Sequence, residues 1–256
     1  MPSIYETYID PGDSIKRQLA VLIDPDDVTT SQVINLVREL DEYAVDYILV
    51  GGSLMISDRF EATISTIKSI TKTPVIIFPG STDQISGIAD AILLLSLISG
   101  RNPELLIGKH VLAAQKLKAS GLEIVPTGYM LVDGGAPTTA SYMSNTLPLP
   151  ADKPEIAATT AMAGEMLGLK TIYLDAGSGA KNAIPSPLIQ QVASSVNIPV
   201  WVGGGIRTPR QLESVYEAGA QVAVIGNAIE KNPSILAEFA SVNRSAISIY
   251  QNSDHL

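Results

Sequence analysis

The sequence predicts one closed (βα)8 barrel, and three observations carry that prediction. Short runs of aliphatic and β-branched residues alternate eight times with longer segments of helical period. The short runs are apolar throughout, which is typical of parallel strands buried on both faces. The chain has 256 residues, close to the size of one such barrel, about 250 residues. No linker divides the chain, so we expect a single domain over residues 1–256.

The expected elements follow in order, and an open doubly wound sheet is the alternative arrangement. The strands are expected at residues 18–23, 46–50, 74–78, 91–95, 123–132, 171–175, 199–202 and 221–225. The helices are expected at 30–42, 60–71, 103–119, 154–167, 185–196, 209–218 and 233–242, with a short or missing helix after the third strand. Pro209 opens a helix, and Gly121 and Gly219 close helices.

One irregular segment, residues 133–150, is longer than an ordinary loop between a strand and a helix. It reads either as a surface excursion or as a contact region. In the second case Tyr142, Met143 and Leu147 are available to pack on a partner subunit or to cover a site.

Composition excludes several classes of function. The formal net charge is −9, which disfavours a general affinity for nucleic acids or anionic lipid headgroups, so any bound phosphate must be held locally. The absence of cysteine excludes disulfides, thiolate metal sites and cysteine nucleophiles. The longest apolar run, residues 91–99, is too short to span a bilayer, and the first residues lack the pattern of a signal peptide. We therefore expect a cytoplasmic protein.

Glycines gather where the expected strands end, which is the edge that carries the active site in such barrels. The strongest signal is WVGGGIRTP, followed about twenty residues on by VIGNAI. Loops after the seventh and eighth strands commonly bind phosphate through backbone N–H groups. The pattern predicts a phosphate cradle of Gly204, Gly205, Gly226 and Asn227, and the alternative is a set of plain turn glycines.

Carboxylates follow the first and sixth strands. Asp24 ends an apolar run without a basic neighbour in sequence, and Mg²⁺ would satisfy it. Ser53 either adds an oxygen ligand or caps the next helix, while Asp26 and Asp27 are expected to be helix caps. Asp175 either acts as a general base or caps a helix.

Catalysis by imidazole is not expected. His110 lies in a helical stretch and His255 in the tail, and we expect both to be structural or solvated. A catalytic triad is therefore not expected.

Six motifs, LIDPD, ILVGGSLM, IIFPGS, YLDAGSGA, VGGGIRTP and VIGNAIE, occur in this order between about residues 22 and 230. In sequence and spacing they resemble the geranylgeranylglyceryl phosphate synthases. The resemblance implies a modified TIM-type barrel and a Mg²⁺-dependent prenyltransferase of ether phospholipid biosynthesis. Such an enzyme joins sn-glycerol 1-phosphate to geranylgeranyl diphosphate by an ether bond and releases diphosphate.

The resemblance also implies roles for particular residues. It makes Asp24 and Ser53 the magnesium ligands and Asp175 the catalytic base, at a position where the family more commonly has glutamate. The segment that holds glycerol phosphate would be Tyr173, Leu174, Asp175, Ala176, Gly177, Ser178 and Gly179, with Gly204, Gly205, Gly226 and Asn227 completing the phosphate site. The apolar third and fourth strand regions would line a channel for the isoprenoid tail.

Leu22 stands where some members of the family have lysine, which points to the larger subfamily and to a homo-oligomer, a hexamer or a dimer. The segment around Tyr142 is a candidate contact for that assembly. Two other functions are weighed against the synthase. One is another phosphate-binding barrel enzyme, such as a sugar-phosphate or indole-phosphate isomerase or synthase. The other is a non-catalytic binder of phosphate or isoprenoid.

Overall fold

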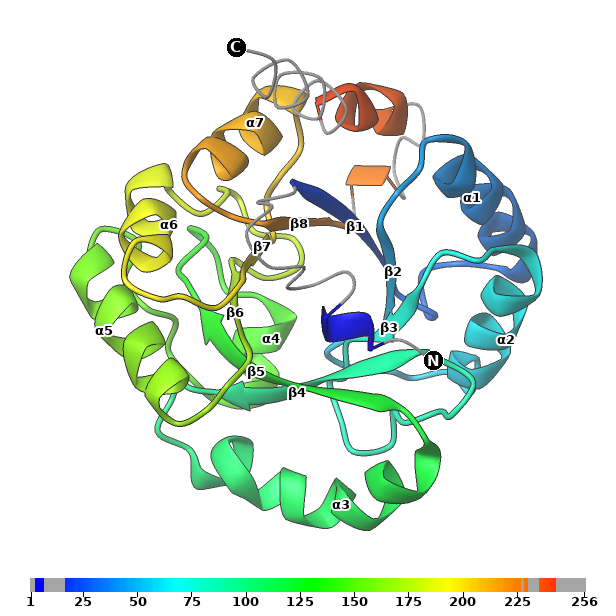
Figure 1. Cartoon of the computed structure of the whole chain (residues 1–256), viewed down its shortest axis with the longest axis horizontal. Coiled ribbons are helices and arrows are strands. Elements are labelled where there is room, and N and C mark those ends of the chain that lie inside the picture. Colours follow the sequence, from blue (N-terminus) through cyan, green and yellow to red (C-terminus); the bar gives the residue numbers. More distant parts are fainter. Residues whose placement is uncertain (1–2, 7–16, 227, 230–234, 243–256) are drawn as a thin grey trace.

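A computed structural model confirms the closed barrel (Figure 1). It describes residues 3–6, 17–226, 228–229 and 235–242. Eight strands pair in parallel in chain order, and β1 closes the barrel on β8. The strands are β1 (Gln18–Ile23), β2 (Tyr47–Val50), β3 (Val75–Ile77), β4 (Ala91–Leu97), β5 (Glu123–Leu131), β6 (Thr171–Asp175), β7 (Val200–Gly203) and β8 (Val222–Ile225). The open doubly wound sheet is thereby excluded.

The helices surround the barrel, as Figure 1 shows. They are α1 (Thr30–Glu42), α2 (Phe60–Ile70), the π-helix η2 (Glu104–Gly108), α3 (Lys109–Ser120), α4 (Thr139–Ser144), α5 (Pro154–Met166), α6 (Ser186–Ala193) and α7 (Pro209–Glu217). Residues 235–242 are also helical. Residues 78–90, between β3 and β4, form turns and no helix, so the expected missing helix is confirmed.

The irregular segment at 133–150 contains one element that the sequence does not predict. The helix α4 spans six residues, and Thr138 caps it by accepting a hydrogen bond from the N–H of Ser141. A single polar turn of this kind has no apolar period, so sequence pattern alone does not reveal it.

Strand side chains alternate between two cores, because successive residues of a strand point to opposite faces. Inside the barrel lies a cluster that includes Tyr47, Tyr173 and Trp201. Tyr47 and Trp201 stack there with ring centroids 5.6 Å apart. Outside the barrel, the other face of each strand packs against the helices in a larger aliphatic cluster that includes Ile48 and Leu174. Side chains of this inner cluster therefore fill the interior of the barrel.

In the part of the chain that the structure describes, no helix combines the length and the apolar character that a membrane crossing requires.

Candidate active site

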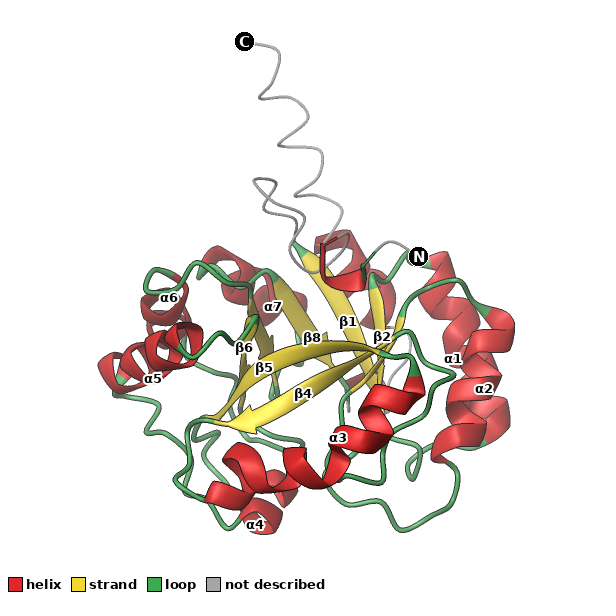
Figure 2. Ribbon diagram, turned by 60° about the horizontal axis from the view of Figure 1, so that its bottom comes forward, coloured by secondary structure: helices red, strands yellow, loops and turns green. Residues whose placement is uncertain are grey.

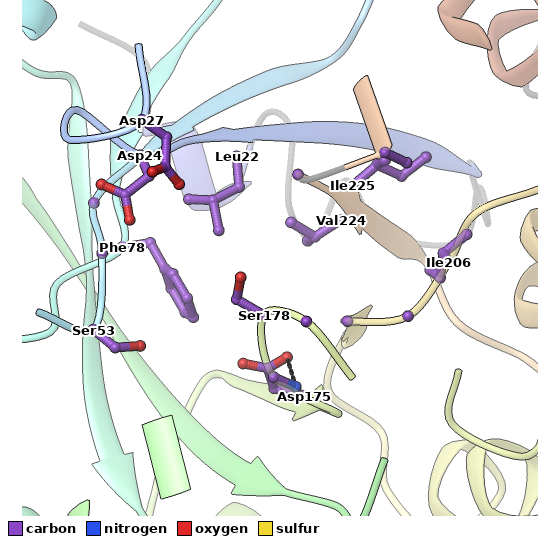
Figure 3. Close-up of a pocket in the computed structure, with 18 of the residues that line it drawn as sticks. Leu22, Asp24, Asp27, Ser53, Phe78, Asp175, Ser178, Ile206, Val224 and Ile225 are labelled. Atoms are coloured by element: carbon purple, nitrogen blue, oxygen red, sulfur yellow. Dashed lines mark hydrogen bonds between the residues drawn. The ribbon is translucent and has the colours of Figure 1, made fainter. Parts of the chain in front are cut away.

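A cavity of about 350 Å³ opens at the carboxyl ends of the strands. Most of the predicted site residues line it: Asp24, Ser53, Tyr173, Asp175, Gly177, Ser178, Gly179, Gly204, Gly205 and Gly226. Figure 3 shows Asp24 and Asp175 on different sides of the cavity, with Phe78 between them. Asn227 lies outside the described residues.

Two residues of the predicted substrate segment are not brought to the cavity. Leu174 and Ala176 belong to the aliphatic core between the strands and the helices. Their neighbours Tyr173 and Asp175 face the other way, because β6 alternates its side chains. The part of the segment that lines the cavity therefore consists of Tyr173, Asp175 and the turn at Gly177, Ser178 and Gly179.

The glycines of the cavity hold backbone conformations that other residues rarely adopt. Gly204 has φ +81° and Gly205 has φ +73°. A Cβ atom on Gly204 would lie 2.7 Å from the N of Gly177, and one on Gly205 would lie 2.4 Å from the O of Asn182. Loops packed this closely expose backbone N–H groups without side-chain cover, which is the arrangement that binds phosphate.

Arg207 is the basic side chain among the described residues that line this cavity. It donates hydrogen bonds to the carbonyls of Lys181, at 2.8 Å, and Ala180. These contacts fix the guanidinium between the loops after β6 and β7, close to the glycines. A phosphate here would meet one fixed cation and several backbone donors.

Asp175 is buried at the end of β6, with 7% of its surface exposed. Its Oδ2 accepts a hydrogen bond from the hydroxyl of Tyr129 at 2.5 Å, and its Oδ1 accepts one from the N–H of Gly177 at 2.7 Å. Burial raises the pKa of this carboxyl, and the two hydrogen bonds oppose the rise without cancelling it. A raised pKa suits a group that takes up a proton during a reaction. Asp175 does not cap a helix, because the next helix begins at Ser186.

Asp24 is a half-buried carboxylate with no compensating cation in contact. Burial raises its pKa, and the charges of Asp27 and Asp26 add to the rise. Among the described residues, no basic side chain lies within ion-pair distance of it. The N–H of Asp26 donates to its Oδ1 at 3.0 Å. A Cβ on Gly52 would lie 2.4 Å from Asp24 Oδ2, so this glycine leaves room for the carboxylate.

The donor set around Asp24 fits a hard divalent cation. Ser53 lines the same cavity and offers a hydroxyl oxygen. The described residues hold no cluster of three or more histidine or acidic side chains that could bind a metal. Mg²⁺ needs no such cluster, since it commonly takes one or two carboxylates and completes its shell with water and substrate phosphates.

The expectation that Asp26 and Asp27 cap the next helix is wrong, because Thr29 caps α1. Asp26 instead ties the loop after β1 to the loop after β2. It accepts hydrogen bonds from the N–H groups of Ile56, at 2.6 Å, and Ser57, at 3.1 Å. Arg59 closes the same junction by donating to the carbonyl of Asp26 at 2.9 Å. These contacts hold Asp24 and Ser53 on a connected frame.

Phe78 and Tyr129, which the sequence analysis did not single out, form one wall with the predicted Tyr173 between Asp24 and Asp175. The rings of Phe78 and Tyr173 stack with centroids 4.9 Å apart, and Tyr129 meets Phe78 at 5.8 Å and Tyr173 at 5.8 Å. Phe78 follows β3 and Tyr129 lies in β5, so only closure of the barrel brings them together. In the sequence, the only indication of this wall is that aromatic residues stand within or beside otherwise aliphatic runs.

A second, larger cavity of about 570 Å³ adjoins the first and shares Gly52, Ser53 and Phe78 with it. It extends between β4, the turns before β4, and the helices η2 and α3. Much of its lining is apolar: Ile85, Ile92, Leu94, Leu95, Leu97, Leu105, Ala113 and Leu117. The cavity occupies the side of the barrel where the helix after β3 is missing.

His110 also lines the second cavity, and its Nε2 lies 3.1 Å from the hydroxyl of Ser96. Burial lowers the pKa of its imidazole. His110 lies outside the polar cavity that holds both carboxylates, and its structural or solvated role stays a prediction. His255 lies outside the described residues.

The fold and the cavity are those of a (βα)8-barrel enzyme that presents backbone N–H groups at its strand ends to a phosphate. Within that class, the chain belongs to the PcrB family, whose sequence pattern matches residues 13–243.

Two relatives of the chain carry the same name. A geranylgeranylglyceryl phosphate synthase of Chitinophaga pinensis is 50% identical over 243 residues, 95% of this chain and 96% of that protein. The Pyrococcus furiosus protein of the same name is 40% identical over 231 residues, 90% of this chain and 91% of that protein. The family resemblance expected from the motifs is confirmed, and the assignment to the larger subfamily stays a prediction.

Solved structures have the same fold. The (S)-3-O-geranylgeranylglyceryl phosphate synthase of Thermoplasma acidophilum, crystallised with its substrate sn-glycerol-1-phosphate, superposes with a TM-score of 0.85 and is 32% identical. The match covers 90% of this chain and 94% of that one. The tryptophan synthase alpha chain of Legionella pneumophila, 14% identical with a TM-score of 0.58 over 90% of this chain and 92% of that one, shares the fold alone.

Proposed function

We propose that this protein is a prenyltransferase that joins sn-glycerol 1-phosphate to geranylgeranyl diphosphate by an ether bond and releases diphosphate, in ether phospholipid biosynthesis. The observation that carries the proposal is the pair of adjoining cavities. One is lined by glycines and carboxylates, aliphatic side chains line much of the other beside polar ones, and the two meet at Gly52, Ser53 and Phe78. A polar acceptor and a long apolar donor would each find a matching surface.

The acceptor would lie in the polar cavity. Backbone N–H groups at Gly204 and Gly205, with Arg207, are the proposed phosphate donors. The glycerol hydroxyl would then face Asp175, whose raised pKa favours uptake of the hydroxyl proton. Tyr129 and the N–H of Gly177 hold this carboxylate in one orientation.

The donor would place its diphosphate near Asp24 and its tail in the apolar cavity. Asp24 and Ser53 are the proposed ligands of Mg²⁺, which when bound supplies positive charge to neutralise the leaving diphosphate. Phe78, Tyr129 and Tyr173 present aromatic rings between the two carboxylates, and such rings stabilise a cationic allylic carbon. The same wall of rings excludes water from that carbon.

The apolar cavity favours this function over the other two that the sequence leaves open. A sugar-phosphate or indole-phosphate isomerase or synthase has no evident use for an aliphatic cavity of this size beside its phosphate site. A non-catalytic binder would have no evident use for the buried, hydrogen-bonded Asp175.

We also propose that the chain forms a homo-oligomer, a hexamer or a dimer. Tyr142, within α4, is 82% exposed, and Leu147, just after the end of α4, is 89% exposed. Both support a contact there. Analytical ultracentrifugation of the wild type and of Leu147→Asp tests this. The cytoplasmic location expected from the sequence stays a prediction, for which cell fractionation is the measurement.

The test of the reaction is a product assay by mass spectrometry. The protein is incubated with Mg²⁺, sn-glycerol 1-phosphate and prenyl diphosphates of several lengths, beside parallel reactions with sn-glycerol 3-phosphate and with EDTA. A prenyl ether that forms only from the 1-phosphate and only without EDTA is the expected result. If no donor gives an ether with folded protein, the synthase proposal is wrong and one of the other two functions replaces it.

A further inference from the structure

The helical segment η2 and α3 is apolar on both of its sides. Its inner side lines the apolar cavity through Leu105, Ala113 and Leu117. On its outer side three large apolar residues lie open to solvent: Ile107 is 60% exposed, Val111 65% and Leu112 75%. A helix at the surface of a globular protein normally presents polar residues outward, and one that is apolar all round is normally covered on every side. The outer side of this helix is therefore suited to an apolar neighbour beyond the barrel.

The charge of this segment is opposite to that of the whole chain. Residues 101–120 contain four basic side chains, Arg101, Lys109, Lys116 and Lys118, and one acidic side chain, Glu104. The segment thus has a formal charge of +3 within a chain of −9. The net charge of the protein disfavours a general affinity for anionic lipids, but a local basic and apolar surface reverses that preference where it occurs.

An anionic bilayer matches this surface better than a second copy of the chain. A two-fold contact between copies would bring the same segment against itself, and so bring together two segments that each have a formal charge of +3. At a bilayer, the apolar side chains enter the boundary between headgroups and acyl chains, and lysines reach anionic headgroups along flexible apolar stems.

The position of the segment connects this surface to the apolar cavity. Lys109 and Lys116 are exposed and also line the cavity, so the cavity reaches the protein surface beside this helical segment. Figure 2 shows α3 lying across the outside of the barrel over β4 and β5. We propose that the outer side of η2 and α3, with Ile107, Val111 and Leu112 at its centre, docks on an anionic lipid bilayer that holds the prenyl donor. This inference rests on the proposed function, because it takes the donor to be a lipid.

The experiment is co-sedimentation of the full chain with vesicles of phosphatidylcholine alone or mixed equally with phosphatidylglycerol. The wild type should bind the mixed vesicles and bind the neutral ones much less. The triple variant Ile107→Ser, Val111→Ser, Leu112→Ser should bind the mixed vesicles with an affinity lower by roughly tenfold or more, because it loses the apolar anchor. Lys118→Glu, outside both cavities, should weaken binding by roughly tenfold, and added salt should weaken wild-type binding.

The matched control is Met166→Ser, Leu167→Ser at the end of α5. These two residues are 83% and 81% exposed and line neither cavity. The control should bind vesicles as the wild type does. An equal loss of vesicle binding in the control and the triple variant would mean that any exposed apolar pair contributes to binding. That result would overturn the assignment of the docking surface to α3.

Activity separates this inference from the proposed function. With geranyl diphosphate dissolved without vesicles, the triple variant should match the wild type. With geranylgeranyl diphosphate carried in mixed vesicles, the triple variant should be slower. The docking inference is overturned if the wild type does not bind mixed vesicles. It is also overturned if the triple variant has a different oligomeric state from the wild type without vesicles, because this side of the helix would then be a contact between copies. Absence of product from every prenyl diphosphate, dissolved or carried in vesicles, would instead overturn the proposed function, while vesicle binding would still report on docking.

Discussion

Asp175 shows how single neighbours set the chemistry of one carboxylate. Burial at the end of β6 raises its pKa, while the Tyr129 hydroxyl and the Gly177 N–H stabilise its charged form. Its side chain is one methylene shorter than the glutamate that the resemblance leads us to expect. The two hydrogen bonds therefore matter more here, because they alone fix where the shorter carboxylate points.

Tyr129→Phe should move the acid side of the pH profile of kcat to higher pH. The variant removes a hydrogen bond that lowers the pKa of Asp175, so the pKa rises further and the base becomes protonated at a higher pH. A hydrogen bond to a charged group is worth about 1.5–3 kcal/mol, which corresponds to a shift of about one pKa unit or more. The pH dependence of kcat for both proteins is the measurement. Tyr142→Phe, at an exposed tyrosine, is the control, and an unshifted acid side in Tyr129→Phe would contradict the base assignment.

Asp24→Asn should lower kcat by about a hundredfold or more, because it removes the proposed carboxylate ligand of Mg²⁺ and the charge stabilisation that depends on it. Thermal unfolding with and without Mg²⁺ and diphosphate gives an independent measurement. Mg²⁺ and diphosphate together should raise the unfolding temperature of the wild type and should not raise that of Asp24→Asn. Asp27→Asn, in the same loop, should keep most of both effects. If Asp24→Asn is stabilised as the wild type is, Asp24 is not the ligand.

At the scale of elements, the absence of a helix between β3 and β4 shapes the site. Residues 78–90 run as turns, and the apolar cavity lies between these turns, β4, η2 and α3. A regular helix in that position would fill this side of the barrel. The missing element is thus the structural origin of the space proposed for the isoprenoid tail.

Ala113→Phe should shift the preferred prenyl donor to a shorter chain. Ala113 is buried in α3 and lines the apolar cavity, so a phenyl ring there takes up space proposed for the tail. We expect the ratio of kcat/KM for geranyl over geranylgeranyl diphosphate to rise by about tenfold or more, since each displaced methylene is worth about 0.8 kcal/mol. The KM for sn-glycerol 1-phosphate should stay unchanged.

The matched control is Ala114→Phe, one residue on and exposed. It adds the same ring to the same helix outside the cavity and should leave the donor preference as in the wild type. An equal shift in both variants would show that the effect comes from the helix and not from the cavity.

At the scale of the whole molecule, the barrel follows from sequence because its evidence is repeated along the chain. Each of the eight apolar runs, with the turn that follows it, indicates one βα unit. The strands are therefore predicted to within two residues at either end. The strand-end motifs predict the polar cavity equally well, since closure alone brings consecutive ends together. The aromatic wall of Phe78, Tyr129 and Tyr173 depends on the register between strands, which no single motif contains.

The end of the barrel opposite the cavity is closed by residues 3–5, seen near the barrel axis in Figure 1. Glu123, at the start of β5, accepts hydrogen bonds from Ser3 Oγ at 2.6 Å, from the N–H of Tyr5 at 2.9 Å and from the N–H of Ile4. Ile4 and Tyr5 pack on the interior cluster. Burial raises the pKa of Glu123, but these hydrogen bonds outweigh it and hold the pKa below the ordinary value of 4.5.

Glu123→Gln should therefore destabilise the fold at neutral pH and have little effect in acid. Because the folded-state pKa is lowered, the contribution of Glu123 is present above its unfolded pKa and is lost as the pH falls through the folded value. After allowance for its partial exposure, we expect a loss of about 1–2 kcal/mol at pH 7, or about 2–6 °C in Tm. Thermal unfolding of both proteins from pH 7 down to about pH 3 is the measurement, with exposed Glu217→Gln as the control. Activity at a temperature below both transitions should be unchanged, because Glu123 lies at the end of the barrel away from the cavity. A Tm difference that persists undiminished in acid would mean that the charge of Glu123 does not hold the barrel end closed.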